Sequence, residues 1–235
     1  GNERVPRVAG VADQLYFAVL LTKHVDRRRD LLIRRHDPRE TQRTEDRTFD
    51  RIGRSEHPVP WLQRIQAQGV LAAMAELNAL HAVGVRGIRL NLAGVSHDVT
   101  EWTRADRLWR TLHELGWHLE VHTDQGALPA VLTKLPSDLP LVVDHMAKPN
   151  EARRNDASIF AVVHRAQKVA TYVKLSGAYR LGGVDATQLA RLWLDALGPS
   201  ALLWGSDWPC TNHEAFADFN ALIEQAHAWI PANIF

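Results

Sequence analysis

Polar side chains follow five apolar runs between residues 83 and 229. The runs end near Asn91, His122, His145, Ser176 and Asp207. Imidazole and carboxylate groups act as general acids and bases or as ligands of a divalent metal ion. One such residue after an apolar run is structural more often than functional. Five of them at comparable places in a repeating pattern favour a shared site that activates water or binds a cation.

The last of the five runs gives the clearest signal. The apolar segment 202–204 leads through Gly205 and Ser206 to the carboxylate of Asp207. A strand that ends in a loop at the C-terminal rim of a parallel barrel has this form, and its Asp would be a general base or a metal ligand. Alternatively, Gly-Ser-Asp is a simple turn and the following Trp-Pro ends the strand.

Spacing separates the histidines. His118 and His122 are four residues apart, which on a strand corresponds to about 13 Å and is too far for one metal ion. We therefore take His122, at the end of its strand, as the site residue and His118 as structural. His145 follows the apolar segment 141–143 at a corresponding place, which makes it the second candidate imidazole.

Arginine and hydroxyl side chains lie beside these residues. Arg89 alternates with apolar residues, and its guanidinium is a candidate anchor for a carboxylate or a carbonyl. The alternative is an ion pair between Arg89 and a neighbouring strand. Ser176, Tyr179 and Arg180 offer two hydroxyls and a cation at the end of the fourth run.

The elements that must position these residues repeat along the chain. Strand and helix patterns alternate at intervals of roughly 25–30 residues, the spacing of βαβ units and a parallel sheet. We predict strands at 83–92, 117–124, 139–143, 172–175 and 202–204. We predict helices at 61–84, 103–116, 128–134, 159–170, 188–197 and 215–229. In a barrel, all five strand ends would meet at one mouth.

The composition is that of an ordinary globular α/β protein. The chain has 235 residues and a formal net charge of +1, which suits one domain over 1–235 and argues against nucleic acid as a partner. No apolar run approaches the roughly 20 residues of a membrane helix. A single cysteine, Cys210, and the lack of a signal-peptide pattern predict a cytoplasmic protein. We expect a small-molecule substrate and leave open a homo-oligomer.

The N-terminal region differs from the rest of the chain in composition and periodicity. Segment 15–21 is apolar enough for a buried strand, whereas 23–56 is rich in Arg and carboxylates without a helical or strand period. We predict a loop or mobile segment over 23–56. Nucleic-acid binding is the alternative, but interleaved carboxylates neutralise most of the positive charge and aromatic stacking platforms are lacking.

Four segments together carry a family resemblance: 84–91, 143–149, 172–177 and 204–209. They resemble the amidohydrolase-related proteins of the amidohydrolase superfamily, and more narrowly its 2-pyrone-4,6-dicarboxylate lactonase and sugar-lactonase branch. The match extends over about residues 77–225. It implies an α/β fold, a (β/α)8 TIM-type barrel that is distorted or incomplete at its N-terminal strands, with the site at the carboxyl ends of the strands.

The resemblance also implies roles. It implies an enzyme that hydrolyses a small cyclic ester or a related carboxylated substrate, with Asp207 as the aspartate that activates water and His145 as the sixth-strand histidine. His122 occupies the fifth-strand position where metal-using relatives place a ligand. The expected substrate contacts are Arg89, Asn91, His122, Ser176, Tyr179 and Arg180. His145, with Arg89 or Arg180, would stabilise the oxyanion.

One departure bears on the cofactor. The family opens with a strand that ends in His-x-His, and this sequence contains no His-x-His; residues 1–60 also differ from the family's first strands. We therefore expect either that no cofactor is required or that His122 and Asp207 hold one divalent metal ion, for which zinc is the first candidate. Further ligands would then come from the N-terminal region. The alternatives are a zinc-dependent amidohydrolase or decarboxylase and a catalytically impaired barrel that only binds a ligand or partner.

Overall fold

The computed structural model describes residues 15–16, 70–94, 97, 106–208, 210–215 and 217–229, and every structural statement below concerns these residues. Of the short strand β1 and the first turn of α3, it describes the backbone alone. The predicted loop at 23–56 and the divergent segment 1–60, apart from β1, lie outside the described residues, and so do the N-terminal histidines that could supply further metal ligands, His24, His36 and His57. None of the described helices is long and apolar enough to cross a membrane.

A single sheet organises the described part of the chain. Its strands follow chain order: β1 (Leu15–Tyr16), β2 (Gly87–Asn91), β3 (His118–His122), β4 (Leu141–Val143), β5 (Thr171–Leu175) and β6 (Leu202–Trp204). The five strands β2 to β6 are parallel, and β1 runs antiparallel to β2. The five predicted strands and their parallel arrangement are confirmed.

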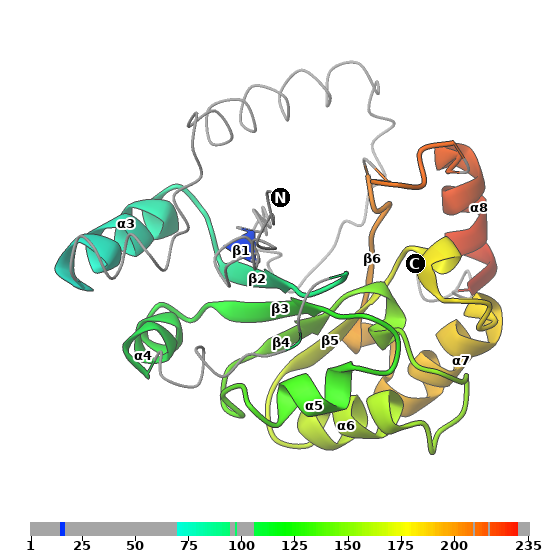
Figure 1. The fold of residues 1–235 in the computed structure, drawn as a ribbon, viewed down its shortest axis with the longest axis horizontal. Coiled ribbons are helices and arrows are strands. Elements are labelled where there is room, and N and C mark those ends of the chain that lie inside the picture. Colours follow the sequence, from blue (N-terminus) through cyan, green and yellow to red (C-terminus); the bar gives the residue numbers. More distant parts are fainter. Residues whose placement is uncertain are drawn as a thin grey trace, which may run out of the picture.

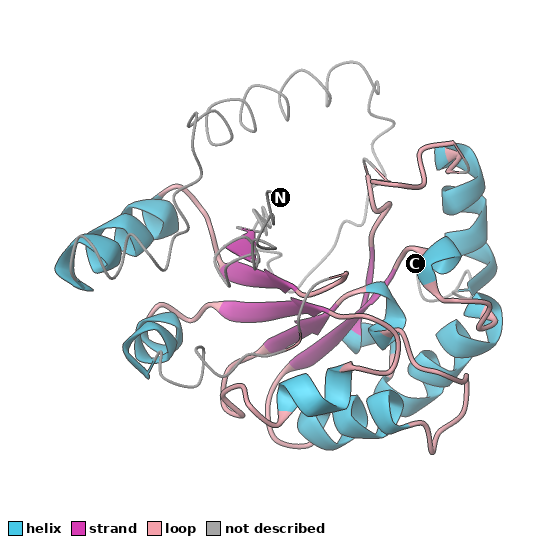
Figure 2. Cartoon of the chain, in the orientation of Figure 1, coloured by secondary structure: helices cyan, strands magenta, loops and turns pink. Residues whose placement is uncertain are grey.

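Helices connect the parallel strands. They are α3 (Val70–Ala82), α4 (Asp106–Glu114), α5 (Leu128–Leu132), α6 (Ala157–Ala166), α7 (Ala186–Leu197) and α8 (Phe219–Trp229). Figure 1 shows α5, α6 and α7 along one face of the sheet, with α3 and α8 toward opposite ends of the described fold. The strands form one layer within this frame, as Figure 2 shows. The predicted helices are found at their places, within about four residues at the described ends. The predicted start of the first helix, at residue 61, lies outside the described residues.

Alternation along the strands separates the core from the site. Ile88 and Leu90 of β2 and Leu119 and Val121 of β3 are fully buried, and they belong to one hydrophobic core. Because successive strand residues point to opposite faces, the residues between them face away from this core. The register pairs Asn91 with His122, so the parallel strands end together and present their polar residues at one edge.

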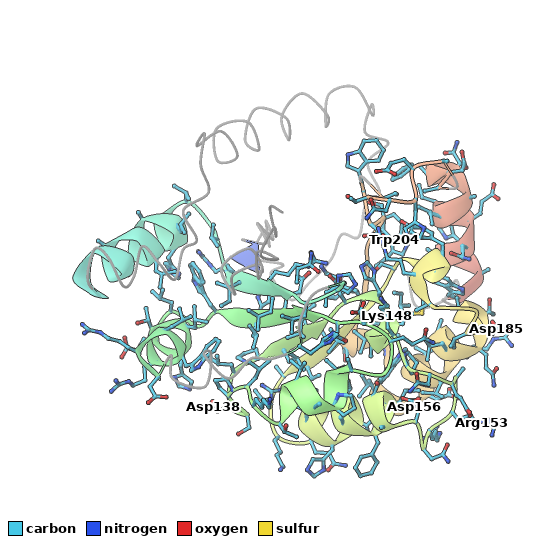
Figure 3. All side chains as sticks on the ribbon, viewed as in Figure 1. Asp138, Lys148, Arg153, Asp156, Asp185 and Trp204 are labelled. Carbon is cyan, nitrogen blue, oxygen red and sulfur yellow. The ribbon has the colours of Figure 1, made fainter. Side chains whose placement is uncertain are left out.

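Aspartates start two of the helices. Asp156 accepts hydrogen bonds from the backbone N–H groups of Ser158 and Ile159 at the start of α6, and from those of Asn150 and Glu151 in the preceding loop. Asp185 accepts hydrogen bonds from the backbone N–H groups of Thr187 and Gln188 at the start of α7. Figure 3 labels both aspartates.

We expect Asp156→Ala to destabilise the protein more than Asp185→Ala. Loss of a helix N-cap typically costs about 0.5–2 kcal/mol. Asp156→Ala removes the cap and also leaves the two loop N–H groups without their acceptor. Urea unfolding of both variants checks this order; equal losses would show that the loop contacts add no stability.

Candidate active site

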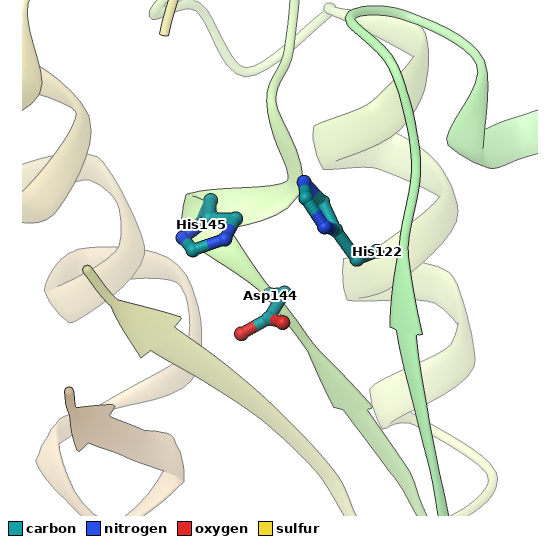
Figure 4. A group of neighbouring side chains, drawn as sticks. All are labelled: His122, Asp144 and His145. Carbon is teal, nitrogen blue, oxygen red and sulfur yellow. The ribbon is translucent and has the colours of Figure 1, made fainter. Parts of the chain in front are cut away.

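The candidate site lies at the carboxyl ends of β2 to β5, on the strand face opposite the core. Figure 4 shows His122, Asp144 and His145 turned toward one another at the ends of β3 and β4. All three side chains are buried. Strand polarity thus brings together residues that are far apart in the sequence, as the spacing of the apolar runs predicts.

Asp144 also belongs to a group of four ion-paired residues next to the two imidazoles. Arg89 Nε lies 2.8 Å from Asp144 Oδ2 and 2.8 Å from Glu120 Oε1, and Arg89 Nη2 also contacts Asp144. Lys174 Nζ lies 2.7 Å from Glu120 Oε1 and 3.3 Å from Asp144 Oδ1. We call Arg89, Glu120, Asp144 and Lys174 the charge quartet. Each carboxylate contacts both cations, so neither is left buried without a counter-charge.

The two carboxyl groups of the quartet differ electrostatically. Burial opposes ionisation of Asp144, but His145, Arg89 and Lys174 hold its pKa well below the usual range. Burial and the negative charge of Asp144 raise the pKa of Glu120, against the opposing pull of the cations. Asp144 is therefore the firmly charged member, and it anchors the guanidinium of Arg89.

Two imidazoles stand at the strand ends. The rings of His122 and His145 meet edge to face with their centroids 4.5 Å apart. Arg89 Nη2 lies 3.3 Å from His122 Nδ1, and Ser176 Oγ lies 3.0 Å from His145 Nδ1. Burial lowers the pKa of His122 to about 2 and also lowers the pKa of His145. Both rings are therefore neutral at neutral pH.

Asp207 completes the site from the end of β6. Its Oδ1 lies 3.6 Å from His145 Nε2. Its Oδ2 accepts hydrogen bonds from the Tyr179 hydroxyl at 2.7 Å and from Arg180 Nε at 2.5 Å. Burial, together with the neighbouring Cys210 and the hydrogen bond to Asp207, raises the pKa of Tyr179, so its hydroxyl remains a donor. Arg180 also reaches the carbonyl of Thr211, which ties the loop after Asp207 to the site.

An unusual turn places His145. His145, Met146, Ala147 and Lys148 all have positive φ, between 40° and 68°. Such left-handed conformations are costly for residues other than glycine and persist where the surroundings enforce them. The buried Trp193 Nε1 donates to the carbonyl of Met146 and fixes the turn from α7. The turn thereby directs the imidazole of His145 toward Asp207.

The described residues include one group that could hold a metal ion. The ligand atoms of His122, Asp144 and His145 lie within 4.8 Å of one another. Asp144, however, is already paired with Arg89 and Lys174. Asp207, the metal ligand expected alongside His122, is not a member of this group; it is paired with Arg180 instead.

Most of the residues singled out in the sequence gather at this site: Arg89, His122, His145, Ser176, Tyr179, Arg180 and Asp207. Arg89 makes the ion pairs with neighbouring strands that its sequence context left open. Asn91 stands apart, since its side chain accepts from the N–H of Ala93 in its own loop.

The sequence analysis missed several polar neighbours. Glu120 and Asp144 were not singled out, although each follows the strand alternation that places it opposite the core. Lys174 was likewise given no role. Lys148 is half-buried at the rim, burial lowers its pKa, and its ammonium makes no hydrogen bond or ion pair within the described segments. Only pairing between strands, which no local pattern encodes, would have revealed the quartet.

The chain belongs to the amidohydrolase family, whose model matches residues 16–232. It is 31% identical over 156 residues to the 2-pyrone-4,6-dicarboxylate hydrolase of Comamonas testosteroni, covering 59% of this chain and 50% of the relative. It is 28% identical over 178 residues to the 4-sulfomuconolactone hydrolase of Rhizobium radiobacter, covering 71% and 57%. The chain thus matches only about half the length of these curated relatives.

A solved structure supports the same assignment. A Pseudomonas putida protein assigned as a 2-pyrone-4,6-dicarboxylic acid hydrolase superposes with a TM-score of 0.58 at 34% identity, over 68% of this chain and 62% of that protein. An Acinetobacter baumannii protein, solved with citric acid bound, shares the fold at 24% identity and a TM-score of 0.55. The predicted family and the α/β fold of TIM-barrel type are confirmed. The expected distortion or incompleteness of the N-terminal strands falls on residues that the structure does not describe, apart from β1, and stays a prediction.

We expect Gly177→Ala to damage the site as well as the fold. Gly177 has a φ of +57°, and an added Cβ would lie 2.6 Å from His145 Nδ1. Gly116→Ala is the matched control, because Gly116 has a φ of +65° and no atom near its Cβ position. We expect about 1 kcal/mol of lost stability from the control and about 1–2 kcal/mol more from Gly177→Ala. Equal losses in urea unfolding would contradict the close contact.

The neutral imidazoles predict a pH dependence of stability. A histidine whose pKa is lowered in the folded state favours unfolding once the unfolded chain takes up its proton, below about pH 6.5. The free energy of unfolding should fall as the pH falls from about 6.5, and the contribution of His122 should continue to fall toward pH 2. The slope is at most about 1.4 kcal/mol per pH unit for each histidine.

Unfolding of wild type and His122→Gln between pH 7 and pH 5 checks this dependence. Glutamine does not titrate, so the variant should lose less stability over this range. His164→Gln, on the exposed side of α6, is the control and should keep the wild-type slope. A wild-type slope in His122→Gln would contradict a neutral, buried His122.

Proposed function

We propose that the protein hydrolyses a small, carboxylated cyclic ester, with water activated by Asp207. The observation that carries the proposal is the approach of His145 and Asp207, 3.6 Å apart, at the common end of the parallel strands. Lactone hydrolases among the relatives give the substrate class. Suitable test substrates are therefore 2-pyrone-4,6-dicarboxylate and 4-sulfomuconolactone.

Asp207 acts as the general base. Its Oδ2 is held by Tyr179 and Arg180, while Oδ1 faces the imidazole of His145. In this role Oδ1 takes a proton from a water, which attacks the lactone carbonyl, and the carboxyl group then returns the proton to the leaving ring oxygen. The two contacts to Oδ2 keep the carboxylate oriented through both proton transfers.

His145 stabilises the oxyanion that forms on the carbonyl. For this role the neutral ring carries its proton on Nε2, the nitrogen that faces Asp207, and Nδ1 then accepts a hydrogen bond from the Ser176 hydroxyl, which lies 3.0 Å away. A preorganised donor of this kind is typically worth a factor of about 10²–10³ in kcat. Arg180 adds a positive charge at the same side of the site.

Cations at the rim bind the substrate carboxylate. Arg89 commits Nε and Nη2 to its carboxylate and imidazole neighbours, so Nη1 is the nitrogen left for substrate as far as the described residues go. Lys148 brings an ammonium without an ion pair in the described part of the chain, which suits a carboxylate ligand. Tyr179 and Arg180 act mainly through Asp207, and Ser176 through His145.

A zinc-dependent hydrolase is the second candidate. The cluster of His122, Asp144 and His145, with ligand atoms within 4.8 Å, favours it. These imidazoles, with Asp207, would hold the ion, which would polarise the carbonyl and lower the pKa of a bound water. Elemental analysis after dialysis separates the two candidates, since the zinc enzyme retains one equivalent of metal.

We expect Asp207→Asn to lower kcat/KM for lactone hydrolysis by at least about 10²-fold, because an amide cannot accept the proton. The fold should be retained, since Asn keeps the shape and one oxygen. The change in absorbance during ring opening of the lactone measures the rate. Asp138→Asn is the control: Asp138 is exposed at the amino end of β4, away from the site, and this variant should keep wild-type activity.

Two outcomes would overturn the proposal. Unchanged hydrolysis by Asp207→Asn would remove Asp207 from the reaction. A stable wild-type protein that turns over no member of the lactone panel would indicate a barrel that only binds a ligand or a partner.

A further inference from the structure

One buried nitrogen of the site has no partner. His122 is 6% exposed, and its Nε2 makes no hydrogen bond with any described residue. Buried polar atoms are almost always paired in native proteins, so an orphaned one at a strand end requires an explanation. His145, whose ring lies edge to face against that of His122, faces Asp207 through its own Nε2.

The other ring nitrogen of His122 has a partner that decides the tautomer. Nδ1 lies 3.3 Å from Nη2 of Arg89. A guanidinium can only donate hydrogen bonds, so Nδ1 must accept and carries no proton. In a neutral imidazole the proton is then on Nε2. The orphaned nitrogen is therefore a hydrogen-bond donor rather than an acceptor.

Arg89 cannot easily give up this orientation. Its Nε contacts Asp144 and Glu120, and both carboxylates are buried and also paired with Lys174. Rotating the guanidinium would leave the two buried carboxylates to share the single positive charge of Lys174, which is unfavourable. The quartet thus fixes the tautomer of His122 before any ligand binds.

We propose that His122 donates a hydrogen bond from Nε2 to the reacting carbonyl oxygen of the substrate, with Arg89 as the positioning residue that sets this tautomer. The inference rests on the proposed hydrolase function and deepens it. It gives the site two neighbouring imidazole donors, His122 and His145, on the oxygen where negative charge develops.

The same geometry does not suit His122 as a metal ligand. Metal binding through Nε2 requires a lone pair there, and a neutral ring would then carry its proton on Nδ1. Two donors, Nδ1–H and the Arg89 N–H, would face each other at 3.3 Å. Asp144, the third member of the candidate metal group, is likewise occupied by cations.

Nuclear magnetic resonance reports the tautomer directly. Long-range proton–nitrogen correlation spectra of protein labelled with ¹⁵N-histidine distinguish protonated from unprotonated ring nitrogens, and His122→Gln assigns the signals. We expect a protonated Nε2 and an unprotonated Nδ1, unchanged by one equivalent of Zn²⁺. Arg89→Met should shift His122 away from this single tautomer. A protonated Nδ1, or signals that move with stoichiometric Zn²⁺ and stay moved after dialysis, would overturn the inference.

Two substitutions test the contact to substrate. The amide nitrogen of Gln reaches about as far as Nε2, whereas that of Asn reaches only as far as Nδ1. We expect His122→Asn to lower kcat/KM by about 100-fold and His122→Gln to lower it by no more than about tenfold. Equal losses in two folded variants would contradict a donor at Nε2.

The outcomes separate this inference from the proposed function. An active enzyme with a protonated Nδ1 on His122 keeps the hydrolase assignment and removes the donor. A protein with the expected tautomer but no turnover of the lactone panel contradicts the hydrolase assignment, and with it the contact to a reacting carbonyl.

Discussion

The buried ion pairs between Arg89 and the carboxylates of Asp144 and Glu120 are the interaction on which the site depends. Two buried negative charges on adjacent strands would repel each other, and each alone would be costly. Arg89 from β2 and Lys174 from β5 neutralise both at once. Four strands are thereby linked through their side chains as well as their backbones. Arg89, held in this way, sets the orientation of His122 above it.

Backbone geometry supplies the second half of the arrangement. Four consecutive left-handed residues after β4 turn His145 back over the strand ends, and Asp207 itself has a φ of +61°. Strain of this kind persists when packing enforces it, here through Trp193 and the close approach of Gly177. Strained backbone thus positions His145 and Asp207, the two side chains at the centre of the proposed reaction. Regular strands position the other residues of the site.

Much of this could be predicted from the sequence because it depends on local pattern. The regular spacing of apolar runs predicted the parallel strands. The polar residues that follow these runs identified His122, His145 and Asp207 as candidates for the site. The charge quartet could not be predicted, since Glu120 and Lys174 lie 54 positions apart and pair only through strand register. The antiparallel pairing of β1 also depends on tertiary contact rather than on local pattern. Arg89 shows the limit most clearly, because its residue type suits a substrate and an ion pair equally well.

The central claim is that side chains alone, at the joined strand ends, polarise the carbonyl and activate the water. The most direct measurement is the steady-state rate of lactone ring opening by enzyme that has been treated with a chelator and shown by elemental analysis to be free of metal. The account predicts the same kcat/KM before and after this treatment. Loss of activity on chelation, restored by one equivalent of Zn²⁺, would contradict it.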